Sequence, residues 1–592
     1  MDVLDALEIS IQANNGRIDP SFLAANRPFV QKLTKQNLAM GKIKSGSLVE
    51  YRGMVQDMFD PELYCREYMD SQSESAKTGL FRDSLPQTWR ANEESLAERE
   101  VVYLVPVPGE TPWMRKKFLG VDESVAASMS LVSDSTVQVI GNNTRIALLN
   151  NKKRERTEDN DVAEALQREN VMETESNEDD VGQSKRNKST TKEGKQTKES
   201  KIQLTENFPL LPSTNDVACM AKFYDDSIIT YEGLRGDVRL QLSNIVRLVG
   251  ILSLDYLDEA NEEKMELEGG IETRDCLPAS VAPRLHVLHV EIESSVPAIS
   301  SFPSLNLVDT RSTCAKLLSR ALHGDSLAGE FALLWLASSL HSQFREAMVG
   351  KLALCFSRMN AKSVDDFESL LREIVPRYQR IRMDDLDGQF LPKKNMEMNR
   401  LIAGRLQVAD GTRLIFDETT LTPRQLSQTA LKNLQALKRL VENQTVEYDF
   451  VFFNREQQVD QPVLVLSSTN KACLVTEVEC TIPVLPESLP NHMSLQNEGE
   501  ALLDPIRVYL ETIKSLGHQV ELSEEICRQA ESDFVEGRKP KDSTLSESDL
   551  HLWLNMTRLI AASFGCVKAT GEHYTRARMM DEERKKRILS IC

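Results

Sequence analysis

The feature that most constrains this chain is a long polar segment that lacks aromatic residues. No Phe, Tyr or Trp occurs between Phe118 and Phe208, and residues 150–206 are rich in Lys, Glu, Asn and Ser. A segment of this kind buries too little apolar surface to offset the entropy that a chain loses when it is ordered. We therefore expect residues 150–206 to form a disordered charged linker that separates folded parts of the chain.

The length of the chain also points to several domains, because 592 residues are too many for one hydrophobic core. The sequence pattern predicts a mixed α/β protein. We divide it into a helical N-terminal segment, a β-rich domain, the linker, a second β-rich segment, an α/β domain and a helical C-terminal part. Their expected ranges are 1–44, 45–149, 150–206, 207–300, 301–500 and 501–592.

Composition excludes several classes of protein. No apolar run approaches the ~18 residues that a membrane span needs, so no membrane association is expected. The acidic N-terminus lacks the basic region of a secretory signal. The ten Cys contain no C-x-x-C pair, and His286 and His289 fall on opposite faces of a strand, so no metal site is expected. A reducing compartment, nucleus or cytosol, fits this usage.

The net charge of −19 bears on the choice of partner. Proteins that bind the nucleic-acid backbone usually present a basic surface. The β-rich runs after Phe208 resemble the second half of an OB-type barrel, but they are poor in the aromatic and basic residues that bind single strands. The sequence therefore favours a protein partner over a nucleic acid.

The stretch Ala321 to Leu340, ALHGDSLAGEFALLWLASSL, resembles a phosphate-binding P-loop that has lost its chemistry. Such a loop runs G-x-x-x-x-G-K-[S/T] and contacts phosphate through its Lys and Mg²⁺ through its hydroxyl. Gly324 and Asp325 open the loop, but Glu330 stands at the Lys position and Phe331 at the Ser/Thr position. The alternative is a corner between two helices, in which Gly324 ends the first and Asp325 or Ser326 caps the second.

Two later stretches continue the ATPase pattern. Residues 414–418, LIFDE, have the form of a Walker B strand, in which Asp417 would hold the metal and Glu418 the attacking water. Residues 463–470, VLVLSSTN, are an apolar strand with Asn470 at the position of a sensor Asn. From residue 501 the pattern is helical and would form a lid.

These stretches resemble the ATPase half of the minichromosome-maintenance (MCM) helicases, an AAA+ module. There a GDP-x-x-AKS loop precedes LADGG…IDE, AANP and a lid with LSEEA, whereas this chain reads GDSLAGEF, VADGTRLIFDE, LSSTN and ELSEEICRQAESDFVEGRK. The Arg of the helicase lid falls near Ser548 here. Long blocks such as VEYRGMVQDMFDPELY, VVYLVPVPGETPW and LHGDSLAGEFALLWLAS are similar to the MCM complex-binding family.

The resemblance implies a nuclear protein that binds MCM helicase subunits and takes part in assembling, stabilising or unloading the complex. It also implies a role in sister-chromatid cohesion and an association with chromatin that is indirect. We expect no enzymatic activity, no cofactor and no small-molecule substrate. The hypothesis is mimicry: a degenerate protomer occupies the place of a working one and holds the ring incomplete. An active ATPase that uses Asp417, Glu418 and Asn470, or a single-strand-binding OB protein, is the alternative.

Two further sets of residues are candidate functional sites. For partner contact we select Phe59, Pro61, Tyr64 and Trp113, whose alternative role is packing between loops of one barrel. The basic residues Lys152, Lys153, Arg154 and Arg156 are consistent with nuclear import, and the alternative is incidental charge in a linker.

Overall fold

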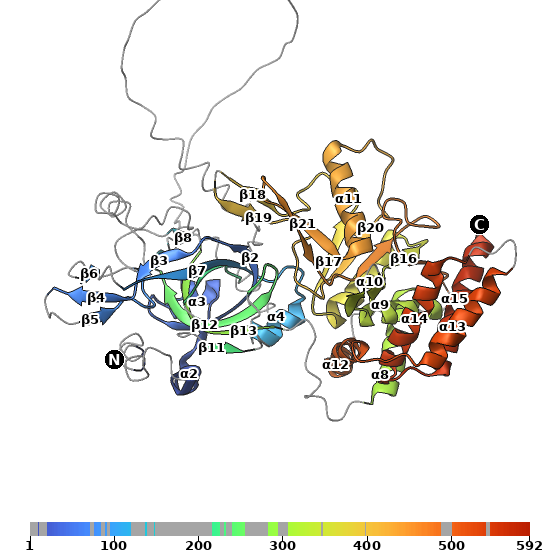
Figure 1. Cartoon of the computed structure of the whole chain (residues 1–592), viewed down its shortest axis with the longest axis horizontal. Coiled ribbons are helices and arrows are strands. Elements are labelled where there is room, and N and C mark those ends of the chain that lie inside the picture. The colour runs from blue at the N-terminus through green and yellow to red at the C-terminus, as the bar shows by residue number, and fades with distance from the viewer. Residues whose placement is uncertain are drawn as a thin grey trace, which may run out of the picture.

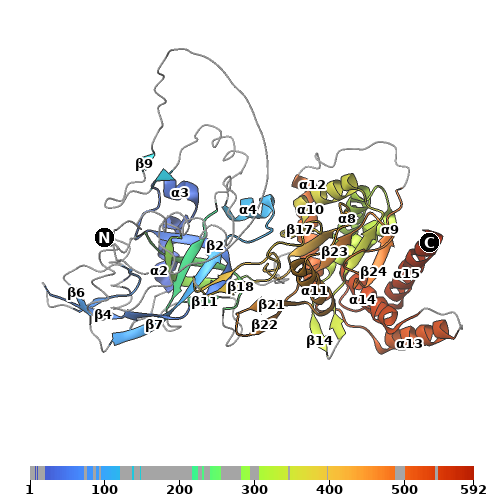
Figure 2. The same ribbon diagram turned by 90° about the horizontal axis from the view of Figure 1, so that it is seen from above.

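The computed structural model shows a β-barrel beside a larger α/β body with a helical end (Figure 1), and the view from above shows the same two bodies (Figure 2). It describes residues 7, 10, 20–71, 76–83, 89–91, 95–119, 137–138, 147–148, 216–224, 230–232, 240–254, 282–293, 306–344, 347–396, 398–486, 500–539 and 545–591. The expected linker at 150–206 and its basic cluster Lys152, Lys153, Arg154 and Arg156 lie outside these residues.

Five strands close the barrel. They are β2 (Leu48–Met58), β7 (Leu96–Val105), β10 (Cys219–Phe223), β12 (Ile245–Ser253) and β13 (Arg284–Ile292). Their hydrogen-bonded order is β2-β12-β13-β10-β7, and β7 also pairs with β2, so the sheet returns to its start. The pair β10–β13 is parallel and the other four pairs are antiparallel. The barrel therefore takes strands from both expected β-rich ranges, 45–149 and 207–300.

Shorter elements lie before the barrel strands and between them in the sequence. Strands β1 (Gln31–Lys32), β3 (Glu62–Cys65) and β11 (Thr230–Glu232) add to its sheet. Strands β4 (Glu67–Asp70), β5 (Ala76–Thr78) and β6 (Trp89–Ala91) form a separate sheet, and β8 (Val137–Gln138) pairs with β9 (Ala147–Leu148). The helical elements of this half are α2 (Pro20–Asn26), the 3-10 helix η1 (Arg27–Phe29), α3 (Lys35–Ala39) and α4 (Pro112–Leu119).

The interior of the barrel is filled by the apolar residues that alternate along its strands. Val49, Val102, Leu104, Val246 and Val287 are among those with no exposed surface. This burial of one strand face is what the alternating pattern of the sequence predicts.

The second half is built on a five-stranded parallel sheet. Its order is β17-β20-β23-β16-β24, with β16 (Leu354–Ser357), β17 (Tyr378–Arg382), β20 (Arg413–Asp417), β23 (Val463–Leu466) and β24 (Cys480–Pro483). All four neighbouring pairs are parallel. Parallel strands are covered by helices on both faces and read as continuous apolar runs, as Leu354–Phe356 and Val463–Leu466 do.

Helices α8 (Leu307–Ala321), α9 (Ser326–Ala337), α10 (Ala361–Ile374) and α11 (Gln428–Asn443) belong to this half. A second sheet has the order β19-β18-β21-β22, from β18 (Lys393–Asn395), β19 (Arg400–Ile402), β21 (Thr445–Asp449) and β22 (Asn454–Gln458). Strands β14 (Ser342–Phe344) and β15 (Ala347–Val349) form a hairpin. The chain is therefore mixed α/β, as the sequence predicts.

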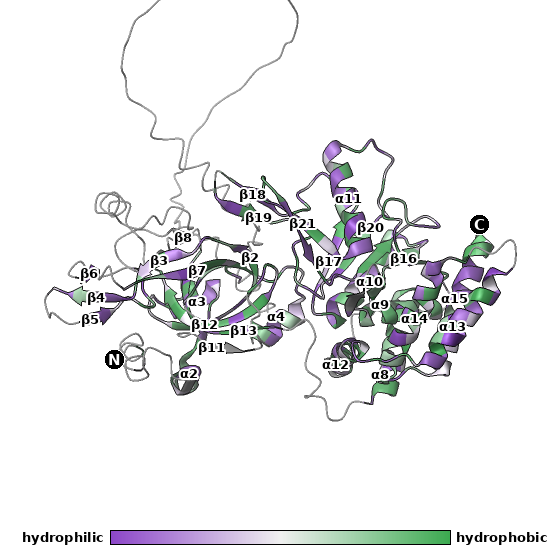
Figure 3. Cartoon of the chain, viewed as in Figure 1, coloured by the Kyte–Doolittle hydropathy of each residue, from purple (hydrophilic) through white to green (hydrophobic). Residues whose placement is uncertain are grey.

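The C-terminal part is helical. It comprises α12 (Glu500–Gly517), α13 (Glu524–Arg538), α14 (Glu547–Ser563) and α15 (Gly571–Ile591). Figure 3 shows the strands of the parallel sheet largely green, whereas α13 and α15 carry many purple residues. The large core that joins these helices to the sheet includes Trp335 and Phe331 of α9 and Met556 of α14, all fully buried.

The barrel is tied to the α/β half by backbone and side-chain contacts. Glu110 and Arg377 form an isolated β-bridge, and the Tyr378 N–H donates to the Gly109 carbonyl at 2.9 Å. Gly109 has φ +69°, and a Cβ there would lie 2.6 Å from the Tyr378 carbonyl oxygen, so only glycine fits this crossing. The two halves therefore meet at a contact between backbones.

Within the described residues, none of the helices combines the length and apolarity of a membrane span.

Candidate functional site

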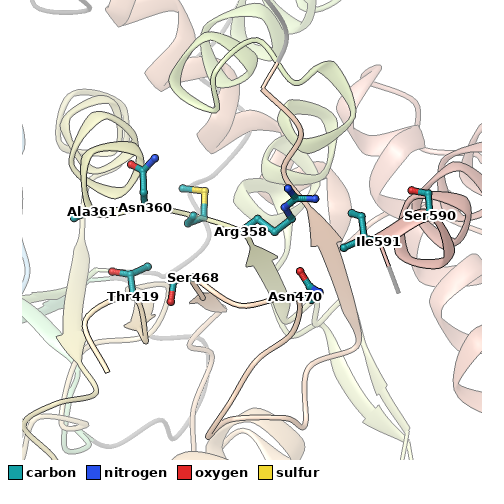
Figure 4. Close-up of a pocket in the computed structure, with 9 residues that line it drawn as sticks. Arg358, Asn360, Ala361, Thr419, Ser468, Asn470, Ser590 and Ile591 are labelled. Atoms are coloured by element: carbon teal, nitrogen blue, oxygen red, sulfur yellow. The ribbon is translucent and has the colours of Figure 1, made fainter. Parts of the chain in front are cut away.

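An open pocket lies at the carboxyl edge of the parallel sheet, where the strands β16, β20 and β23 end. Its volume is about 830 Å³. Figure 4 shows Thr419 and Ser468 on one side, Arg358 and Asn470 in the middle and the end of α15 on the other side. Ligands of open α/β sheets usually bind at this edge. The lining residues are Arg358, Met359, Asn360, Ala361, Thr419, Ser468, Asn470, Ser590 and Ile591.

The loop between β16 and α10 forms the upper wall of this pocket. It is short, because Asn360 already caps α10 by accepting a hydrogen bond from the Ser363 N–H at 2.8 Å. The N–H groups of Arg358 and Met359 donate to the carbonyls of Thr469 and Ser467, both at 2.9 Å. Two backbone donors of this loop are thus bound to the loop that follows β23.

Asp417 ends β20 and is fully buried. Arg380 of the neighbouring strand β17 donates two hydrogen bonds to its Oδ2, at 3.0 and 2.6 Å. Its Oδ1 accepts from the N–H and the hydroxyl of Thr419, at 2.9 and 2.6 Å. Both carboxylate oxygens of Asp417 therefore have partners within the chain.

The carboxylate of Glu418, the residue after Asp417, is also hydrogen-bonded within the chain, but to different partners. Glu418 is 1% exposed. Its carboxylate accepts three backbone N–H bonds of 2.6, 2.9 and 3.1 Å, from Cys473, Leu474 and Val475 respectively. These bonds take up three of the roughly four lone pairs of the carboxylate and fix the loop after β23.

These contacts decide whether a nucleotide with Mg²⁺ fits. Phosphate binding needs free backbone N–H groups, and the metal needs a free carboxylate and a hydroxyl. Two loop N–H groups and Asp417 are engaged. Ser363 is buried, with its hydroxyl 2.9 Å from the Asn360 side-chain oxygen and 2.5 Å from His323 Nε2. The carboxylate and the hydroxyl that a bound metal would need at this edge are therefore engaged within the chain.

The degenerate loop expected at Gly324–Phe331 lies elsewhere. It joins helix α8 to helix α9, so no strand precedes it as one precedes a P-loop. Gly324 has φ +88°, and Asp325 caps α9 by accepting from the Ala328 N–H at 3.0 Å. Phe331 is fully buried. The segment adopts the helix–helix corner that was the alternative.

Glu330 connects three helices in this corner. Arg311 of α8 lies 2.5 Å from its Oε2, and Arg576 of α15 lies 3.0 Å from its Oε1. Asp325 is joined to the same C-terminal helix by Arg587, at 2.6 Å. The acidic residues of this stretch thus hold α15 against α8 and α9.

The residues selected for partner contact fall in different surroundings. Tyr64 is 6% exposed and packs edge-on against Tyr224, with ring centroids 5.1 Å apart. Phe59 is half-buried against a barrel cluster that includes Met54 and Val105, and Pro61 is exposed. Trp113 is half-buried between the two halves of the chain: it donates to the Val375 carbonyl at 3.2 Å, and Arg507 lies 4.3 Å over its ring. The structure brings none of them together with Asn470.

Sequence reasoning missed the loop after β16. The signal was present, because the apolar run LALCF is followed by Ala361-Lys362-Ser363, the same AKS that ends the helicase loop. No glycine stands in the intervening residues 357–360, whereas Gly-Asp stands at 324–325, so the sequence comparison was made at 324–331. Arg380 was missed because nothing in sequence links it to Asp417, 37 positions later.

Among the described residues, no group of three or more His, Cys, Asp or Glu could hold a metal ion.

Comparison with known proteins gives a match over most of the chain. The sequence model of the family described as mini-chromosome maintenance replisome factor matches residues 32–588. Similar curated proteins carry the name mini-chromosome maintenance complex-binding protein: that of Salmo salar is 30% identical, that of Arabidopsis thaliana 28% and that of Homo sapiens 27%. Each alignment covers 92% of this chain and 88 or 89% of the relative. The chain belongs to the mini-chromosome maintenance replisome factor family.

Proposed function

We propose that this chain is a non-catalytic protein that binds subunits of the MCM helicase and regulates assembly, stability or unloading of the complex in DNA replication. The name of the relatives, which align with it over about nine-tenths of its length, supports the partner. The observation that carries the non-catalytic part is the internal engagement of Asp417 and Glu418.

We further infer that the α/β half is a degenerate AAA+ module with α12–α15 as its lid. In an AAA+ module, three segments meet at one edge of the sheet: the loop that precedes a helix, the strand that ends in Asp-Glu, and the strand that ends in a polar sensor residue. The loop after β16, the end of β20 and the loop after β23 do meet around one pocket. This arrangement supports descent from a nucleotide site whose donors now bind one another.

The barrel is proposed to be of the OB type. Support comes from its five strands, which close into one circuit. OB barrels bind single strands on the face of their second and third strands, here β7 and β10. On that side Val101, Tyr103 and Met220 are buried together with Ala409 of the α/β half, and Arg400 lies 5.6 Å over the Tyr103 ring. Because the chain covers this face itself, we favour a structural role for the barrel.

In the cell, we propose a nuclear location, a role in sister-chromatid cohesion and an indirect association with chromatin. The mechanism is mimicry of a protomer. A module of this shape pairs with an MCM subunit where another subunit would sit, and it contributes no free metal ligand or catalytic acid to the shared site, because Asp417 and Glu418 are engaged within the chain. The ring that includes it stays incomplete.

The test is to mix the purified full chain with purified MCM subunits and to measure complex formation and ATP hydrolysis together. The proposal expects a complex, with no hydrolysis by the chain alone. The exposed variants Lys362→Ala and Asn470→Ala should bind as the wild type does. Absence of any complex, or hydrolysis lost in Lys362→Ala, would contradict it.

A further inference from the structure

The hairpin formed by β21 and β22 ends in an exposed apolar tip. Its turn is Phe450-Val451-Phe452-Phe453, where most hairpin turns carry Gly, Asn, Asp or Ser. Val451 is 50% exposed, Phe452 82% and Phe453 60%. Three adjacent large apolar side chains in solvent are costly unless a partner covers them, and such patches mark interaction sites.

The turn is held in one shape. Asp449 pairs with Asn454 across the hairpin, and the Phe450 N–H donates to the Phe453 carbonyl at 3.0 Å. The rings of Phe450 and Phe453 stack with centroids 5.1 Å apart. The Val451 N–H donates to the Asp449 carboxylate at 2.8 Å while its φ is +70°, a backbone conformation that a β-branched residue rarely adopts. The chain tolerates this strain and presents Phe452 outward.

The acidic residues beside the tip are paired within the chain. Glu447 accepts from Arg439 at 2.5 Å and from Asn454 at 2.6 Å. Asp449 lies 3.7 Å from Lys393 of the neighbouring strand β18. Arg455 of β22 is the basic residue nearest the tip in sequence and it is exposed. A single cation is a small part of the several basic residues through which a nucleic acid or an anionic lipid surface is bound. The chemistry of the tip matches an apolar pocket on a protein.

We propose that the tip Val451–Phe453 is an anchor that inserts into an apolar pocket of an MCM subunit. This inference rests on the proposed function and adds to it the contact that provides affinity. A projecting turn whose backbone is held by hydrogen bonds is suited to this role, because aromatic side chains that fill a pocket dominate the energy of most interfaces. The rest of the interface provides orientation.

The experiment compares the full-length chain with Phe452→Ser and with Phe452→Ser/Phe453→Ser, by titration against purified MCM subunits. The matched control is Phe29→Ser, because Phe29 is 74% exposed on the barrel side of the molecule. Phe452→Ser removes only an exposed side chain, so its thermal unfolding should match the wild type. The double variant also loses the stacking of Phe453 on Phe450, so its unfolding is measured as well and its far-UV circular dichroism should match the wild type. We expect affinity to fall about tenfold or more in the double variant and to stay unchanged in Phe29→Ser. The ratio of wild-type to variant affinity should be the same in about 0.1 M and about 1 M salt, since apolar contact is not screened.

The outcomes separate the anchor from the proposed function. If the wild-type chain binds no MCM subunit, the proposed function fails together with the anchor. If the wild type binds and both tip variants bind equally well, the anchor alone is overturned. Co-sedimentation of the wild type with phosphatidylcholine vesicles that is lost in the double variant would also overturn it, by assigning the tip to lipid.

Discussion

Arg380 places two of its N–H groups on one carboxylate oxygen of Asp417, at 3.0 and 2.6 Å, across neighbouring strands of the parallel sheet. Arg380 also reaches Glu368 of α10 at 2.7 Å. The guanidinium thus supplies the positive charge that an Asp at this strand end takes from a metal in a working ATPase. A fixed cation of the chain is always present, so the site keeps its shape without nucleotide.

Removing this cation should destabilise the fold. In Arg380→Ala the fully buried Asp417 keeps only its bonds to Thr419, and breaking a buried ion pair on one side costs about 2–4 kcal/mol. Chemical denaturation should show this loss. The control is Arg382→Ala on the same strand, where the side chain is 62% exposed and the change should stay within about 0.5 kcal/mol. Equal stability of the two variants would contradict the assigned role of Arg380.

Restoring a Lys in the stretch Gly324–Phe331 should not restore nucleotide binding. Glu330→Lys puts a cation beside Arg311 and Arg576, so we expect a loss of about 3 kcal/mol and weaker packing of α15. The isosteric Glu330→Gln removes the charge without adding repulsion and should lose less. Thermal unfolding measures both, and a fluorescent ATP analogue tests binding. Tight Mg²⁺-dependent binding by Glu330→Lys would mean that this corner is a phosphate site after all.

The Trp113 ring should couple the barrel to the α/β half. Its indole donates to Val375 and is covered by Arg507, so Trp113→Ala removes both contacts. For a half-buried Trp we expect a loss of about 2 kcal/mol, smaller than in a core. Calorimetry should show the barrel and the α/β half unfolding at more widely separated temperatures. Phe29→Ala serves as the exposed aromatic control, and a single unchanged transition in Trp113→Ala would argue against this coupling.

The Asp57 carboxyl should make stability depend on pH. Burial raises its pKa to about 6, while the N–H of Leu401 and the charges of Lys394 and Arg400 act in the opposite direction. The folded state therefore binds this proton more tightly than the unfolded chain does. Stability contributed by the group falls as pH rises from about 4 to about 6 and is constant above, a change of roughly 2–3 kcal/mol.

Asp57→Asn should remove this component. The difference in unfolding free energy between variant and wild type should shift in favour of the variant as pH rises through that window. One of the two N–H bonds that Asp57 accepts, from Met58 and Leu401, is lost, which lowers stability by about 1 kcal/mol at all pH values. A pH-independent difference would show that Asp57 titrates normally.

Local patterns predicted much of the fold. Continuous apolar runs identified β20 and β23, and the periodicity after residue 501 predicted the helices α12–α15. The closure of the barrel could not be predicted from local sequence patterns, because β2 and β7 pair with strands that lie more than a hundred residues later. Such pairing depends on side-chain packing within the barrel, which a single sequence does not display.

The candidate site was predicted in part. Asn470 does line the pocket, and Asp417 ends its strand at that edge. The direction of Glu418 could not be predicted, because it depends on three backbone N–H groups more than fifty residues away. Trp113 and Tyr64 were selected as partner contacts because both lie in segments that contain Pro. In the structure they contact Arg507 and Tyr224, which come from distant parts of the chain, and a local pattern does not show such contacts.

The most direct test is the association of the full chain with MCM subunits, measured by light scattering after size exclusion. Three samples are compared: the wild-type chain with MgATP, the wild-type chain without nucleotide, and the Lys362→Ala variant. The account predicts that the chain joins the complex in all three samples, because its own site at the carboxyl edge of the sheet is occupied by Arg380 and backbone contacts. A complex that forms only with MgATP and is lost in Lys362→Ala, although the MCM subunits are unchanged, would contradict it.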